Sequence, residues 1–99
     1  MEVKHSDFAC QEPNTGRRWV IEAKGLTTAV GLDFRTGLGQ LVQRATDPKI
    51  CYGLAVPDIP SFLSQCRAVS AWVRESLHIH WLIVGEDGSV RVVNPTEEM

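Results

Sequence analysis

The chain has 99 residues, of which 43% are hydrophobic and 22% are charged, as is typical of one small globular domain. Its formal net charge of −2 gives no overall attraction to nucleic acid, so such binding would need a local basic patch. Three widely spaced cysteines without a Cys-x-x-Cys pair argue against a disulfide framework and against a thiolate zinc site. We therefore predict a single cytoplasmic domain over residues 1–99, with a flexible tail at 94–99 and no membrane contact.

The first elements that the sequence predicts form a β-hairpin. One strand starts near residue 3 and runs to residue 10, and a second covers 17–24. Between them, Glu12-Pro13-Asn14-Thr15-Gly16 is a cluster of turn-forming residues. We expect the two strands to pair in the antiparallel direction around this turn.

The register of this hairpin decides where three charged residues lie. If the turn centres between positions 14 and 15, Asp7 lies opposite Glu22, because both are equally far from the turn. Side chains alternate along a strand, so Asp7, Glu22 and Lys24 would then share one face. A slip of one residue would move Asp7 to the opposite face.

A helical period begins near Asp33 and ends before Asp47-Pro48. The apolar residues of this helix are predicted at positions Leu38, Leu41, Val42 and Ala45. Gln40 and Arg44 are four residues apart and so are neighbours on its surface. Gly37 and Gly39 each cost about 1 kcal/mol relative to alanine inside a helix, which suggests either a close backbone approach or a frayed first turn.

The second half of the sequence predicts a buried strand at 50–56, a helix that begins near Pro60, and a hairpin of strands at 79–84 and 90–93. The helix has an apolar repeat, and its other face, which includes Arg74, is expected to be solvated. The members of the repeat are Phe62, Cys66, Val69, Val73 and Leu77. The predicted fold class is α/β of the α+β kind, a mixed central β-sheet flanked by two helices in the order β-β-α-β-α-β-β.

Two histidines near the start of the 79–84 strand offer a second possible site. His78 and His80 are two residues apart, so both would lie on one face of a strand and could ligate a metal. No third ligand is evident nearby, and we favour a histidine pair at the edge of the core.

The N-terminal half resembles the restriction endonuclease-like superfamily, the PD-(D/E)xK nucleases. The resemblance rests on Asp7, on Glu22-Ala23-Lys24 at the end of the next strand, and on Gln40 in the helix segment Gly37-Leu38-Gly39-Gln40-Leu41. It covers residues 5–57 and implies a metal-dependent nuclease that hydrolyses DNA. By this resemblance Asp7, Glu22, Lys24 and Gln40 are the catalytic residues.

The resemblance also implies a metal centre. Asp7, Glu22 and the backbone carbonyl of Ala23 would supply oxygen ligands suited to Mg²⁺ or Mn²⁺. Lys24 would orient the attacking water, and Gln40 would bond to that water or to a phosphate. Arg44 could assist from one turn further along the helix.

The superfamily core usually has a helix and a strand before its motif aspartate, whereas six residues precede Asp7 here. We therefore expect an uncovered apolar sheet face and an open edge, and a homodimer that covers them.

Two alternatives remain open from the sequence. The chain could be a non-catalytic module of the same fold that binds nucleic acid or protein. It could also be a small interaction protein in which Glu22 and Lys24 form an ordinary surface pair.

Overall fold

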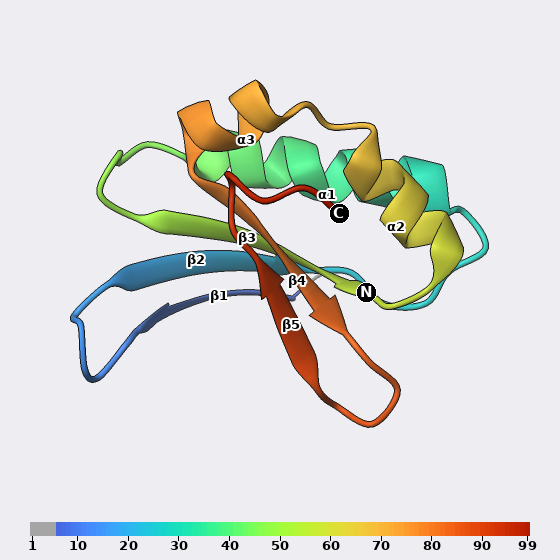
Figure 1. The fold of residues 1–99 in the computed structure, drawn as a ribbon, viewed down its shortest axis with the longest axis horizontal. Coiled ribbons are helices and arrows are strands. Elements are labelled where there is room, and N and C mark those ends of the chain that lie inside the picture. The colour runs from blue at the N-terminus through green and yellow to red at the C-terminus, as the bar shows by residue number, and fades with distance from the viewer. Residues whose placement is uncertain (1–5) are drawn as a thin grey trace.

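A single mixed β-sheet with helices on one side makes up the protein, seen here in a computed structural model that describes residues 6–99, apart from the side chains of Ser6 and Asp7. Its elements, labelled in Figure 1, are β1 (Ser6–Gln11), β2 (Arg18–Ala23), α1 (Val30–Arg44), β3 (Cys51–Pro57), α2 (Pro60–Arg67), α3 (Ala71–Leu77), β4 (Ile79–Val84) and β5 (Val90–Val93). The strand order in the sheet is the order in the chain. The predicted fold class, a mixed sheet in an α+β arrangement, is confirmed.

The three central strands run parallel, and the two edge strands run antiparallel to their neighbours. The connections β2-α1-β3 and β3-α2-α3-β4 place all three helices on the same side of the sheet (Figure 1). The core lies between these helices and the sheet and comprises Phe34, Leu41, Tyr52, Leu54, Val56, Phe62, Cys66, Ile79, Trp81, Ile83 and Val93. Within the described residues, no helix is long and apolar enough to cross a membrane.

Within residues 6–99, no helix lies on the opposite side of the sheet (Figure 1). Trp19 and Ile21 on this side are buried among their neighbours, at 9% and 8% exposure. Towards the edge strands, large apolar side chains remain in contact with solvent: Phe8 is 51%, Val90 55% and Val92 46% exposed. We call this surface the open face.

Helix α1 begins at Val30, three residues before the predicted start, and its apolar stripe is shifted from the predicted one. Phe34, Gly37 and Leu41 are buried against the sheet, whereas Val42 is 44% exposed. The pattern of apolar residues did not reveal the first turns of this helix, because three glycines lie at positions 25 to 37.

The single second helix that we predicted is two helices, because the chain leaves helical geometry around Ser70, whose backbone is extended. Serine favours such positions, where it precedes a helix. The break reorients the following turns, so Arg74 points inward and is 5% exposed rather than solvated.

Arg74 ties the C-terminal residues to the fold. Its guanidinium donates hydrogen bonds to the backbone carbonyls of Asn94 (3.2 Å) and Glu97 (2.8 Å), and it lies 5.9 Å from the ring centre of Trp81. Met99 packs against the core. Our expectation of a frayed tail at 94–99 did not include these contacts.

Candidate active site

The N-terminal hairpin has the register that the turn chemistry predicts. Asp7 pairs with Glu22 across β1 and β2, so the turn does centre between positions 14 and 15. Gly16 adopts a left-handed backbone (φ 74°), and its amide donates to the carbonyl of Glu12 at 3.0 Å. The backbone of Asp7 thus lies beside that of Glu22. The side chain of Asp7 is outside the described part of the chain.

Glu22 is a fully buried carboxylate on the helix-covered side of β2. Its exposed fraction is 0%, and its Oε1 accepts a hydrogen bond from Nη1 of Arg44 in the last turn of α1. A buried carboxylate is costly unless it is paired and hydrogen-bonded. Glu22 is therefore not the exposed strand residue of the surface-pair alternative.

Lys24 follows β2 directly and stays aligned with β3, because its amide donates to the carbonyl of Ala55 at 2.9 Å. Its aliphatic stem crosses α1 at Gly37. A Cβ atom at Gly37 would lie 2.8 Å from Cε of Lys24 and 3.1 Å from Cδ1 of Leu54. Gly37 thus provides the close backbone approach that its helical position suggested, and Gly39, with open space around it, does not.

Gln40 lies on α1 between the two residues that contact β2. Positions 37, 40 and 44 share one face of a helix, because they are three and four residues apart. Gly37 lies against Lys24, and Arg44 is hydrogen-bonded to Glu22. Gln40 is therefore on the side of α1 that faces β2. Its amide oxygen is buried.

Strand β2 and helix α1 thus bring Glu22, Lys24, Gln40 and Arg44 to one side of the sheet. Arg44, which the sequence suggested only as an assisting residue, forms an ion pair with Glu22. In the sequence, only its position four residues after Gln40 indicated that Arg44 would lie near the candidate site.

A hollow of about 390 Å³ opens at the carboxyl ends of β2, β3 and β4, and Lys24 borders it. Its lining is mainly apolar, with Asp58 and Glu86 also present. Lys24 therefore reaches both the interface with α1 and an opening at the ends of the parallel strands.

The donor set that the resemblance implies consists of oxygen ligands. Carboxylate and carbonyl oxygens are hard ligands suited to Mg²⁺, and Glu22 already holds a cation, the guanidinium of Arg44. Among the side chains that the structure describes, no group of three or more His, Cys, Asp or Glu residues could hold a metal. Asp7 is not among those side chains, and Ala23 would contribute a backbone carbonyl.

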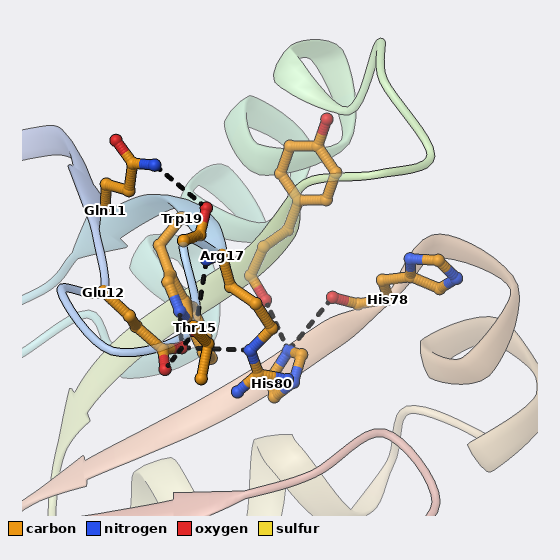
Figure 2. A network of polar contacts seen from close by, with 9 residues as sticks. Gln11, Glu12, Thr15, Arg17, Trp19, His78 and His80 are labelled. Carbon is orange, nitrogen blue, oxygen red and sulfur yellow. Dashed lines mark hydrogen bonds and ion pairs between the residues drawn. The ribbon is translucent and has the colours of Figure 1, made fainter.

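A separate polar network surrounds the hairpin loop on the far end of β2 (Figure 2). Glu12 accepts hydrogen bonds from Nε1 of Trp19 (2.6 Å), from the hydroxyl of Thr15 (3.0 Å) and from Nε of Arg17 (3.1 Å). The bond from Trp19 is the main cause of a lowered pKa of the Glu12 carboxyl; desolvation opposes it, and the bonds from Thr15 and Arg17 add to the lowering. These contacts fix the loop that sets the hairpin register.

His78 and His80 do not form a pair on one strand face, contrary to the metal-site interpretation. His78 precedes β4 as the C-cap of α3, with a left-handed backbone (φ 56°), and Figure 2 shows its ring directed away from His80. His80 lies on β4 with its ring 4.6 Å from that of Trp19. Its Nδ1 lies 3.2 Å from the carbonyl oxygen of Tyr52 and 3.1 Å from that of His78. His80 is a buried, hydrogen-bonded histidine, but His78 is exposed, so the histidine pair that we favoured at the edge of the core does not form.

The fold is similar to that of a solved structure, an XisH family protein from Nostoc punctiforme PCC 73102. The two chains superpose with a TM-score of 0.64 over 89% of this chain and 74% of that chain, at 18% sequence identity. No protein-family model matches this sequence, and a search of curated proteins finds no significant relative. At this identity the similarity establishes a shared fold.

Proposed function

We propose that this protein is a metal-dependent nuclease that hydrolyses phosphodiester bonds in DNA. The observation that carries the proposal is Glu22, a fully buried carboxylate that pairs in register with Asp7 on one side and contacts α1 on the other. The resemblance of Asp7, Glu22-Ala23-Lys24 and Gln40 to the PD-(D/E)xK pattern supports it.

The metal would be Mg²⁺ or Mn²⁺, held by the carboxylates of Asp7 and Glu22 and the carbonyl of Ala23. When bound, such an ion lowers the pKa of a coordinated water and neutralises charge that develops on the phosphoryl oxygens. The rest of the mechanism depends on side chains of this chain.

Lys24 orients the attacking water in this proposal. Its stem is confined between β2 and α1 at Gly37, which restricts the conformations of the side chain. A water held in the attacking geometry reacts faster because less entropy is lost at the moment of reaction. Gln40, on the side of α1 that faces β2, donates its amide hydrogens to the water or to a phosphate oxygen.

DNA would approach from the carboxyl ends of the parallel strands, where Lys24 borders the hollow. The net charge of −2 gives little long-range attraction, so the metal and local basic side chains would supply the electrostatic part of binding. Weak affinity for DNA in the absence of divalent metal is therefore expected.

The proposed assembly is a homodimer formed through the open face. The two edge strands expose apolar surface there, at Phe8 of β1 and at Val90 and Val92 of β5. Exposed apolar patches on a sheet are sites of association.

Cleavage of plasmid and single-stranded DNA with Mg²⁺ or Mn²⁺ tests the function. We expect the native protein to cut, and Lys24→Ala and Glu22→Gln each to reduce the rate by about a hundredfold or more. Lys49→Ala, which alters an exposed lysine after α1, is the control and should cut at the native rate.

Absence of cutting by well-folded native protein would refute the nuclease. The favoured interpretation would then be a non-catalytic module of the same fold. Binding of DNA without metal dependence would identify that alternative.

A further inference from the structure

Arg44 is the cation that Glu22 holds in this structure. It reaches across from the last turn of α1, and its Nη1 donates to Oε1 of Glu22. The Glu22 side chain is 0% exposed, whereas that of Arg44 remains 34% exposed. The pair therefore has one fixed, buried member and one member with access to solvent.

A guanidinium and a divalent metal compete for the negative charge of the same carboxylate. Both use the lone pairs of the carboxylate oxygens, and both are positively charged. An arginine cannot relieve the repulsion by losing its proton, because its pKa is too high. Binding of a metal at Glu22 would therefore weaken the ion pair with Arg44 and favour displacement of the guanidinium.

The surroundings of Arg44 permit that movement. It lies in the last turn of its helix and is partly exposed, so its long side chain can turn outward while the backbone of α1 stays in place. A planar guanidinium that has left a carboxylate is well suited to a phosphate group, which it can bind through two parallel hydrogen bonds.

We infer that Arg44 competes with the divalent metal for the Glu22 carboxylate, and that Arg44, once displaced, binds a phosphate of the DNA backbone. This inference rests on the proposed function. It assigns Arg44 two positions, one in each stage of the reaction cycle, and it makes metal binding and DNA binding cooperative.

Metal titration by calorimetry tests the competition without reference to cleavage. The comparison is between the native protein, Arg44→Gln and the matched control Arg35→Gln, which makes the same change at an exposed arginine of α1. Removing the competing charge should tighten Mn²⁺ binding by about tenfold or more, the equivalent of one charge-assisted hydrogen bond. Arg35→Gln should bind Mn²⁺ as the native protein does.

The outcomes separate the inference from the proposed function. Measurable Mn²⁺ binding that is equal or weaker in Arg44→Gln would overturn the competition and leave the nuclease standing. No Mn²⁺ binding in the native protein or in Arg44→Gln would overturn both.

A measurement on the native protein covers the case in which Arg44→Gln fails to fold. The NMR signal of the Arg44 side-chain Nε–H group is identified by its loss in Arg44→Lys. On saturation with Mg²⁺ this signal should move to the position of a solvated arginine. A signal that is unchanged when Mg²⁺ is bound would overturn the inference.

The proposed contact of Arg44 with DNA phosphate predicts a change in the opposite direction, a loss of DNA affinity. In a Lys24→Ala background, which the proposed function makes unable to cut, Arg44→Gln should weaken DNA binding in Mn²⁺ by about tenfold even though it tightens binding of the ion. Unchanged DNA affinity would show that displaced Arg44 does not contact phosphate.

Discussion

His80 is a titratable side chain held neutral by its position. It is 6% exposed, and its ring contacts that of Trp19 on the open face. Burial lowers the pKa of His80 below its ordinary value of 6.5, and this outweighs the hydrogen bonds to the carbonyls of Tyr52 and His78, which act in the other direction. The folded protein therefore resists protonation at this residue more than the unfolded chain does.

This shift predicts a loss of stability in mild acid. Between the lowered pKa of the folded state and 6.5, the unfolded chain binds the proton and the folded chain does not, so the free energy of unfolding falls as pH decreases through that window. Above 6.5 the contribution is constant. Urea unfolding at several pH values should show the decrease in the native protein and a smaller one in His80→Gln.

His78→Gln is the control for this experiment, because His78 is exposed. The decrease of stability in mild acid should persist in this variant. A profile of His80→Gln with the native slope would show that other groups cause the acid sensitivity.

At the scale of single residues, the sequence predicted positions better than contacts. The pairing of Asp7 with Glu22 followed from turn chemistry, because the turn lies between them and the register is set by counting. The contact of Glu22 with Arg44 joins residues 22 positions apart through a helix whose orientation the sequence does not specify. The pattern of apolar residues placed Arg74 on the wrong face because it did not reveal the break at Ser70.

Helix α1 contains two glycines in contrasting surroundings, which gives a matched pair of substitutions. Gly39 has no atom within 4 Å of an added Cβ, so Gly39→Ala should stabilise the protein by about 1 kcal/mol through helix propensity alone. At Gly37 the added Cβ would lie 2.8 Å from Cε of Lys24, so the lysine must shift. Gly37→Ala should therefore reduce nuclease activity by about tenfold or more while the protein remains folded.

Thermal unfolding and the cleavage assay read out these two effects. Gly39→Ala should raise the melting temperature and cut DNA at the native rate. Native activity in Gly37→Ala would show that confinement of Lys24 at this position has no part in catalysis.

Most secondary structure elements were predictable, but their ends and one division were not. Strands β3, β4 and β5 follow from apolar runs bounded by proline and glycine. The separation of α2 from α3 was missed because the apolar repeat continues from Phe62 to Leu77 across the break. A repeat of this kind records which residues are apolar, and not whether the backbone between them remains helical.

At the scale of the whole molecule, the three described helices cover one side of the sheet, and no helix of residues 6–99 covers the open face (Figure 1). If a second copy covers that face, Val92→Lys should produce a monomer, because it places a charge in the proposed interface. Val42→Lys is a closely matched control: Val42 is 44% exposed on α1, and Val92 is 46% exposed on β5.

Light scattering at high micromolar concentration measures the mass of each species. We expect dimers for the native protein and for Val42→Lys, and a monomer for Val92→Lys. A native monomer at that concentration would rule out the proposed assembly.

The sheet adds its strands in the order in which they occur in the chain, and this has a consequence for synthesis on the ribosome. No strand has to insert between two that are already paired, so the sheet can grow as the nascent chain emerges. Arg44 is synthesised before β3, which pairs with β2 at Glu22, and so it is available to the carboxylate before that strand is in place. The charge that is most costly to bury can thus find its partner before the core around it is complete.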